Sequence, residues 1–249
     1  MASALAASDA GVSDVDNATQ HRVAVKTVRR WRRLYQRRGL PRGQVHTSVP
    51  CPRCTDAALD EKSYVELLGW YLGDGHISAG RRGVWNLHIY NDATYVELNV
   101  HILELMRQVK PGGRPHTRLV QGCVVSTVSW KHWPCLLPQH GPGRKHERPI
   151  VLEAWQRAMV ERQPEDFLRG LFHSDGSRSR NWATRTVGGE RKRYDYPREF
   201  VNRSDDILTL CTWALDVAGI RWRRPRVNAI AVSRRDDVLR LDNLIGPKC

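Results

Sequence analysis

The feature that most constrains this chain is a short helical pattern that occurs twice. Residues 67–75 read LLGWYLGDG and residues 168–176 read LRGLFHSDG, so both hold a glycine, three residues, a small residue and then Asp-Gly. Small residues four positions apart share one helix face, where another helix can approach closely. The glycine after each aspartate suits the position at which a helix ends. The pattern predicts two helices in contact through Gly69, Gly73, Gly170 and Ser174.

The elements expected around the two motifs also repeat. Alternating and helical periodicity predicts an α+β fold with the order helix, two strands, helix, two strands, helix in each half. In the first half we expect helices over 64–72, 92–109 and 133–137 and strands over 76–78, 84–90, 114–120 and 124–130. In the second half we expect helices over 150–160, 165–173, 205–217 and 236–244 and strands over 181–187, 198–202, 221–227 and 229–233. The interval between the motifs has room for one small repeat.

The aspartate at the end of each motif indicates metal chemistry. If the two helices pack with like ends together, Asp74 and Asp175 meet at one end. Two carboxylates there repel each other unless a cation sits between them. Mg²⁺, or Mn²⁺, suits such oxygen ligands, and a bound ion can activate water for phosphodiester cleavage. One copy of the pattern could be an ordinary glycine-capped helix, whereas two copies favour the metal site.

The charge balance predicts a polyanionic partner. The chain has 249 residues, with 40 Lys and Arg against 26 Asp and Glu and a formal net charge of +14. Nucleic acid is the usual partner for such a surplus, and an anionic membrane surface is the alternative. No apolar run is long enough to span a bilayer, and the N-terminus lacks a secretion signal. We therefore expect an intracellular protein, cytoplasmic or associated with the nucleoid, that binds double-stranded DNA and no membrane.

The N-terminal region predicts a second DNA-binding element. Residues 22–42 hold nine Lys or Arg and no acid. Val28, Trp31 and Leu34 lie on one face of a predicted basic helix, with Thr27 as its N-cap. The stretch 11–31 resembles the second half of a helix-turn-helix of the recombinase or homeodomain type. Residues 1–20 are expected to be disordered or only marginally structured, which leaves the completeness of that motif open. A basic helix that only binds phosphates is the alternative.

Composition divides the chain into four parts. We expect a helix-turn-helix-like basic segment over 1–45, a proline-containing linker over 46–60, and two repeats over 61–145 and 146–249. Within the linker, Cys51 and Cys54 have the spacing of a zinc pair. A zinc site needs four ligands, and no second Cys-x-x-Cys pair follows. A zinc site and a turn with two reduced thiols both stay open.

The paired motifs resemble those of the LAGLIDADG homing endonucleases of the single-chain type, over about residues 60–246. The resemblance implies two αββαββα repeats that form a pseudo-twofold monomer, with antiparallel sheets that make a saddle over DNA. It implies that Asp74 and Asp175 bind the metal ions, helped by the main-chain carbonyls of Gly73 and Ser174. It also implies cutting of both DNA strands with 3′ overhangs, the reaction of intron homing.

The same resemblance indicates helper residues and a DNA surface. The family usually places a basic residue near the end of the last strand of each half, which indicates Lys131 and, in the second half, Arg234 or Arg235. An arginine is a poor proton acceptor, so the two halves differ. Phosphate contacts position a protein and groove contacts specify sequence, and the sequence does not sort the basic residues between these roles. The residues expected to bind DNA are Arg29, Arg30, Arg32, Arg33, Arg178, Arg180, Arg185, Arg203, Arg223, Arg224, Arg226 and Arg234.

Two other functions compete with the endonuclease. Some bacterial transcription regulators join a LAGLIDADG-like fold to a helix-turn-helix and have lost cleavage, and some family members are intron maturases. Degenerate members usually lose one or both acids, whereas both are present here. We therefore favour a metal-dependent, monomeric DNA endonuclease of the homing type.

Overall fold

The computed structural model describes residues 1–38, 50–178, 182–195 and 198–248. The chain forms two compact units, Met1–Pro50 and Cys51–Cys249. Cys51, which the sequence assigns to a linker, is buried within the second unit. Within the described ranges no helix combines the length and hydropathy needed to cross a bilayer.

Over residues 1–38, the part that the structure describes, the N-terminal unit forms the helices α1 (Ala2–Asp9), α2 (Asp14–Gln20) and α3 (Val25–Arg38). Residues 1–20 form two helices, so the expectation that they are disordered or only marginally structured is wrong. Leu5, Ala18 and Val28, one from each helix, are buried together with Asn17. The Asn17 side-chain amide donates to the main-chain oxygen of Ala4 at 2.6 Å. Short alanine-rich helices are marginal alone, so this tertiary contact stabilises them.

Helix α3 begins two residues before the predicted cap. It starts at Val25, and the Thr27 amide donates to the Ala24 oxygen at 2.7 Å, so Thr27 lies inside the first turn. Arg22 turns the chain between α2 and α3 at a φ of 51°. Gly39 and Pro41, which by residue type indicate the end of this helix, lie outside the described residues.

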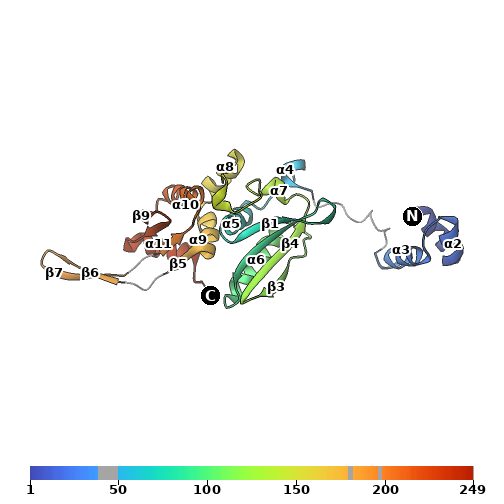
Figure 1. Ribbon diagram of the computed structural model, residues 1–249, viewed down its shortest axis with the longest axis horizontal. Coiled ribbons are helices and arrows are strands. Elements are labelled where there is room, and N and C mark those ends of the chain that lie inside the picture. The colour runs from blue at the N-terminus through green and yellow to red at the C-terminus, as the bar shows by residue number, and fades with distance from the viewer. Residues whose placement is uncertain (39–49, 179–181, 196–197, 249) are drawn as a thin grey trace. The chain divides into compact units, whose positions relative to one another are not determined.

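The second unit contains two repeats with the same topology (Figure 1). The first repeat comprises α5 (Glu61–Leu72), β1 (Gly75–Ala79), β2 (Trp85–Asp92), α6 (Val96–Val109), β3 (His116–Val120), β4 (Cys123–Trp130) and α7 (Trp133–Leu136). The second comprises α9 (Pro164–Asp175), β5 (Gly176–Arg178), β8 (Arg198–Val201), α10 (Asp205–Val217), β9 (Arg223–Arg226), β10 (Ala229–Val232) and α11 (Arg235–Ile245). Their antiparallel sheets have the orders β1-β2-β4-β3 and β5-β8-β10-β9, which match strand for strand. The predicted α+β fold of two αββαββα repeats is confirmed.

The remaining described elements of the second unit precede the first repeat or lie between the elements already named. They are α4 (Pro52–Thr55), the 3₁₀ turns η1 (Arg81–Gly83) and η2 (Lys145–Glu147), α8 (Ala154–Arg162) and the strands β6 (Trp182–Val187) and β7 (Glu190–Asp195). β6 pairs with β7 in a separate two-stranded hairpin and not with the second sheet, which corrects the expected role of residues 181–187. Gly188 and Gly189 form its turn with φ values of 62° and 84°, as a tight hairpin with the twist of its strands requires.

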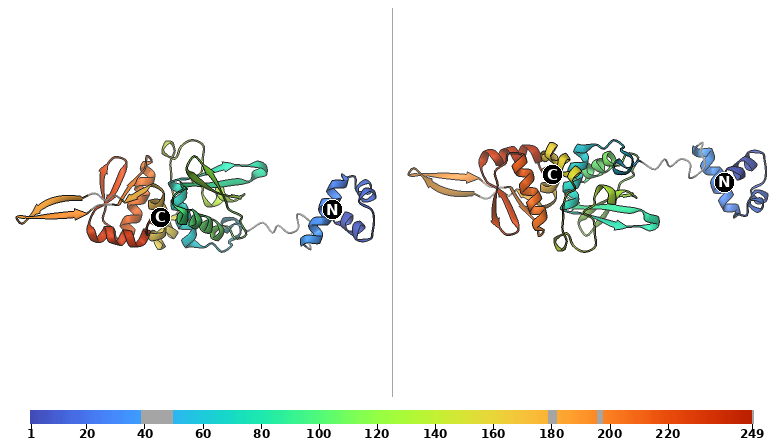
Figure 2. Two further views of the ribbon diagram at one scale, coloured as in Figure 1. Left: turned by 90° about the horizontal axis from the view of Figure 1, so that it is seen from below. Right: turned by 90° about the horizontal axis from the view of Figure 1, so that it is seen from above.

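The motif helices α5 and α9 pack backbone against backbone. A Cβ atom on Gly69 would lie 2.5 Å from the Phe167 oxygen, and one on Gly170 would overlap the Glu66 oxygen and lie 2.8 Å from the Trp70 nitrogen. Glycine at these two positions is therefore what permits the close approach. In Figures 1 and 2 the cyan α5 and the gold α9 meet where the two repeats meet.

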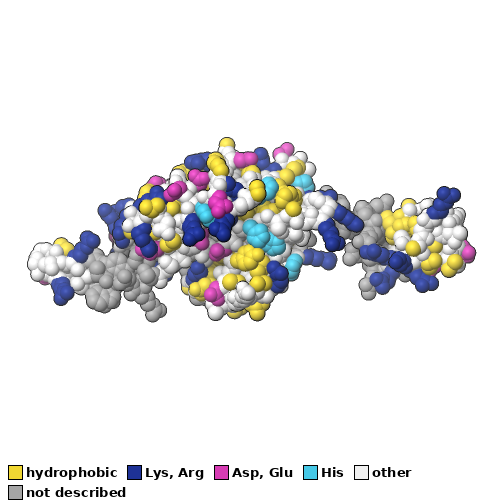
Figure 3. All heavy atoms as spheres, in the orientation of Figure 1, with side chains coloured by type: hydrophobic (Ala, Val, Ile, Leu, Met, Phe, Trp, Pro, Cys, Tyr) yellow, Lys and Arg dark blue, Asp and Glu magenta, His cyan; other side chains and the backbone are white. Residues whose placement is uncertain are grey.

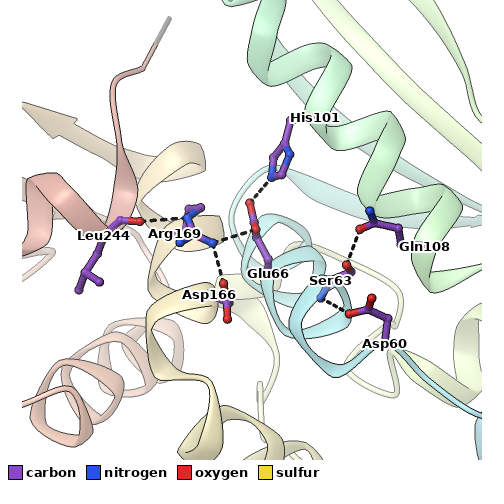
Figure 4. A network of polar contacts seen from close by, with 8 residues as sticks. All are labelled: Asp60, Ser63, Glu66, His101, Gln108, Asp166, Arg169 and Leu244. Atoms are coloured by element: carbon purple, nitrogen blue, oxygen red, sulfur yellow. Dashed lines mark hydrogen bonds and ion pairs between the residues drawn. The ribbon is translucent and has the colours of Figure 1, made fainter.

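A polar network crosses this contact between the repeats (Figure 4). The buried Glu66 carboxylate of α5 lies 2.6 Å from His101 Nε2 of α6 and 3.3 Å from Arg169 Nη1 of α9. Arg169 also pairs with Asp166 at 2.6 Å and donates to the Leu244 oxygen of α11 at 3.0 Å. The hydrogen bond to Glu66 raises the pKa of His101. The network thus joins four helices from both repeats into one body.

Candidate metal centre and nucleic-acid interface

The motif helices end together, which brings the two aspartates to one place. A Cβ atom on Gly73 would overlap the Ser174 hydroxyl and lie 3.1 Å from Asp175 Oδ2. The main-chain oxygen of Asp74 accepts from the Tyr90 amide of β2 at 3.1 Å. On the other side, the Asn202 amide donates to Asp175 Oδ2 at 2.7 Å. Each aspartate is therefore fixed by its own repeat at the junction of helix and sheet.

Burial perturbs both carboxyl groups, and the charge of Asp74 adds to the shift of Asp175. Burial raises the pKa of Asp74, and the nearby ammonium groups of Lys145 and Lys248 oppose that rise. Burial, and then the charge of Asp74, raise the pKa of Asp175 to about 6. Two partly buried acids side by side, one of which opposes ionisation of the other, form an electrostatic environment in which a cation binds well.

Two lysines that the sequence analysis did not single out lie beside these acids. Lys145 Nζ donates to the main-chain oxygens of Tyr71 at 2.5 Å, Leu72 at 2.8 Å and Gly73 at 2.6 Å. These carbonyls end α5 and have no partner within the helix, and a cation is favoured there. Burial lowers the pKa of Lys145 to about 8, while Asp175 and Asp74 oppose the shift.

Lys248 takes the matching position in the second repeat. Its Nζ donates to the main-chain oxygens of Ser174 and Gly176, both at 3.3 Å. Burial lowers its pKa, and the charges of Asp74 and Asp175 act against that. The intervals from 74 to 145 and from 175 to 248 are nearly equal. That repetition was the signal in the sequence that could have identified both lysines.

The structure does not bring Lys131 to the carboxylates. Gly75, next to Asp74, pairs with Ile89 of β2, and Ile89 in turn pairs with Ser126 of β4. Because β4 runs in the same direction as β1, it leads away from Asp74. Lys131 lies about five residues beyond Ser126, a separation of about 16 Å along the strand. Arg234 likewise follows β10, which leads away from Asp175.

The residues at this place fit a hard divalent cation. They offer two carboxylates and the main-chain oxygens of Gly73 and Ser174, a donor set of oxygen atoms of the kind that Mg²⁺ and Mn²⁺ prefer. The lysine ammonium groups now contact those two carbonyls, which shows that the carbonyl oxygens are accessible to a positive charge.

An open cleft of about 430 Å³ adjoins Asp175. Asn202 and Asn228 contribute neutral polar groups to its wall. Its basic and histidine lining residues are Arg144, Lys145, His146 and Arg203. In Figure 3, dark blue Lys and Arg side chains and cyan histidines lie over the middle of the second unit. A phosphodiester can therefore approach the carboxylates along a cationic wall.

The predicted DNA-binding arginines are exposed wherever the structure describes them, and Arg30, Arg33, Arg185, Arg203 and Arg234 are among these. Others contact neighbouring side chains: Arg29 and Arg32 pair with Asp14, Arg178 with Asp242, Arg224 with Asp205 and Arg226 with Glu199, and Arg223 donates to the Ser233 hydroxyl. Surface pairs of this kind contribute less than about 1 kcal/mol, so a phosphate can replace the acid. Arg180 lies outside the described residues.

The outer face of the first sheet carries a neutral aromatic group. His76 stacks on His88 at 4.6 Å and on Tyr90 at 5.6 Å between ring centroids. His88 also contacts the hydroxyls of Ser78 and Thr127, each at 2.9 Å, and burial lowers its pKa to about 4. Such a face offers hydrogen bonds and ring surface without charge, which suits contacts to base edges.

His173 is packed inside the contact between the motif helices. Its ring stacks on Trp70 with centroids 5.8 Å apart, and burial lowers its pKa to about 4. A neutral, buried imidazole in a stack is a core residue and not a metal ligand of the aspartate pair.

Comparisons with known proteins find similarity only among solved structures. No protein-family model matches the sequence, and no curated protein sequence matches it. A structure of the homing endonuclease I-DmoI in complex with DNA and Ca is 14% identical, covers 74% of this chain and 89% of that chain, and has a TM-score of 0.49. The N-terminal LAGLIDADG domain of DUF199/WhiA is 15% identical, with 75% and 82% coverage and a TM-score of 0.46. The homing endonuclease I-WcaI bound to its DNA recognition sequence is 13% identical, with 77% and 84% coverage and a TM-score of 0.45.

Proposed function

We propose that this chain is a LAGLIDADG-type endonuclease that cuts both strands of DNA at a specific site with Mg²⁺ or Mn²⁺. The observation that carries this proposal is the repetition of the site. Each repeat contributes one carboxyl group, Asp74 or Asp175, and one lysine, Lys145 or Lys248, to the place where α5 and α9 end. Two equivalent sets of groups suit a reaction on two antiparallel strands.

The residues divide the work as their chemistry allows. Asp74 and Asp175 hold the cation, with the carbonyl oxygens of Gly73 and Ser174. When bound, the cation lowers the pKa of water and stabilises charge on the phosphate. In place of Lys131, we assign proton handling to Lys145 and Lys248. A lysine with a pKa of about 8 exchanges a proton readily near neutral pH, which fits Lys145 for that role.

Double-stranded DNA is the proposed partner, bound by a monomer inside the cell. One chain holds both repeats, so a complete site needs no second copy. The cationic cleft supports contacts to phosphates, and the His76, His88 and Tyr90 stack supports contacts to bases. The exposed Arg30 and Arg33 of α3 support DNA binding by the N-terminal unit, which we propose acts as a helix-turn-helix.

A specific feature favours a second candidate, a DNA-binding regulator that does not cut. The N-terminal unit has three packed helices, and its last helix carries exposed arginines. Such a unit can bind DNA by itself, without any reaction at the aspartates. The two candidates differ in one observable, which is cleavage.

Selection from a randomised plasmid library in Mg²⁺ distinguishes them. We expect the unmodified chain to leave 3′ overhangs at one long site. Asp74→Asn and Asp175→Asn should bind that site and leave it intact, while the control Asp56→Asn, at an exposed position, should cut it. Specific binding without cleavage in either Mg²⁺ or Mn²⁺ would instead establish the regulator.

A further inference from the structure

Four potential metal ligands from two distant segments meet away from the aspartate pair. They are Cys51, Cys54, His132 and Cys135, and their ligand atoms all lie within 4.8 Å of one another. The first two belong to the segment around α4 and the other two to the segment around α7, and these helices are in contact. The cysteines are free thiols in this structure.

The two segments present their ligands in the same way. Cys51 precedes α4 as its N-cap and Cys54 follows three residues later; His132 precedes α7 and Cys135 follows at the same interval. The Cys54 amide donates to the Cys51 oxygen at 2.9 Å, and the Cys135 amide donates to the His132 oxygen at 3.0 Å. Each segment is thus a single helical turn that directs two ligands to one side. The second pair is His-x-x-Cys, which a search for Cys-x-x-Cys passes over.

The three distances among the ligand atoms of Cys54, His132 and Cys135 match a tetrahedral zinc site, and Cys51 lies within 4.8 Å of all three. Bonds of about 2.3 Å to sulfur and about 2.05 Å to nitrogen at tetrahedral angles require edges of about 3.8 Å between sulfurs and about 3.6 Å between sulfur and nitrogen. The observed separation of Cys54 Sγ and Cys135 Sγ is 3.7 Å. His132 Nδ1 lies 3.6 Å from each of these sulfurs.

We propose that Cys51, Cys54, His132 and Cys135 bind one structural Zn²⁺ ion. Three thiolates and an imidazole are soft ligands that favour zinc over Mg²⁺, so this site is chemically distinct from the aspartate pair. Four protein ligands close the coordination sphere, which is the arrangement of structural and not catalytic zinc. A disulfide does not explain the cluster, because bonded sulfurs lie about 2.05 Å apart.

The site anchors the beginning of the second unit to its first repeat. Helix α4 has only four residues, none of them buried. Apart from Cys51, which is buried, the segment relies on contacts such as that of the Arg53 guanidinium, 4.6 Å from the centroid of the Trp155 ring. A Zn²⁺ ion here would hold residues 51–54 against residues 132–135 through its ligand bonds. Helices of only four residues need such a tertiary constraint to be stable.

Metal content and spectroscopy of the full-length chain test this proposal. Protein purified without chelators should contain about one zinc per chain by mass spectrometry of the elements. Replacement with Co²⁺ should produce the visible bands of a tetrahedral site and sulfur-to-cobalt charge transfer. Less than about one tenth of an equivalent of zinc, together with no such bands after Co²⁺ addition, would overturn the proposal.

Variants assign the ligands without relying on cleavage. Cys54→Ser and Cys135→Ser should each lower metal content at least about tenfold, whereas His132→Cys should keep the metal and strengthen the charge-transfer band. Cys123→Ser is the matched control, since Cys123 is half-buried and lies outside the cluster. Asp74→Asn and Asp175→Asn should keep full zinc, which separates this site from the proposed nuclease. Equal loss of zinc in Cys123→Ser, or a disulfide between Cys54 and Cys135 in fresh protein, would contradict the assignment.

Discussion

Replacing Asp175 by asparagine is expected to make the metal-free protein more stable at pH 8. The Asp175 carboxyl has a pKa of about 6, raised by burial and by Asp74. Asparagine has nearly the same shape but no charge, and its amide oxygen can still accept the hydrogen bond from Asn202. The substitution therefore removes an unfavourable ionisation and keeps the packing.

The size of this stabilisation follows from the pKa of Asp175. An aspartate whose pKa rises from 3.8 to about 6 on folding costs about 3 kcal/mol of folding free energy when ionised, at about 1.4 kcal/mol per pH unit. The attraction of Lys145 and Lys248 is already contained in that pKa, so we expect the variant to gain up to about 3 kcal/mol at pH 8. Folding raises the pKa of Asp175, so the protonated carboxyl favours the folded state. This contribution to the stability of the wild type is fully present below about pH 4. It is lost as the pH rises through about 6, and the gain in the variant develops over that window.

Urea unfolding at pH 5 and pH 8, without added Mg²⁺, measures this difference. Asp56→Asn is the control for loss of an acid, since Asp56 is exposed and asparagine tolerates its φ of 52°. Addition of Mg²⁺ at pH 8 should stabilise the wild type and have little effect on Asp175→Asn. The reasoning is refuted if Asp175→Asn is less stable than the wild type at pH 8, or if its advantage is as large at pH 5.

Two further substitutions test the site and its support. Lys145→Met should slow single-turnover cleavage of bound DNA by about a hundredfold or more, whereas Lys131→Met should leave that rate unaltered; the reverse order would return the helper role to Lys131. Gly170→Ala should lower the free energy of unfolding by about 3 kcal/mol, because the added methyl meets backbone atoms of α5 on the facing side. Val217→Ala, at an exposed position on α10, is the control. If Gly170→Ala lowers the free energy of unfolding no more than this control does, α5 and α9 can move apart at little energetic cost.

The repeat and its central contact could be predicted because they depend on local pattern. Glycines four residues apart define one helix face, and an aspartate followed by glycine marks where that helix ends. These features depend on residues within two turns of each other, which a sequence displays directly. The two acids, the α+β class and the order of elements followed from such signals.

Features that depend on strand direction required the tertiary structure. Lys131 ends the predicted last strand, as the resemblance suggests, but β4 runs parallel to β1 and so carries Lys131 away from Asp74. Periodicity identifies a strand without giving its direction relative to a strand elsewhere in the sheet. The hairpin of β6 and β7 was misassigned for a related reason, since alternation alone does not identify a strand's partner.

Groups that act together from distant segments were also decided by the tertiary structure. Lys145 and Lys248 each reach the end of a motif helix more than 70 residues earlier in the chain. Similarly, Cys51 and Cys54 supply two of the four potential metal ligands, and His132 and Cys135 supply the other two. Local sequence determined which helices form and which acids end them. Chain topology determined which loops arrive beside those ends, because only the folded path sets distances between residues that the sequence separates.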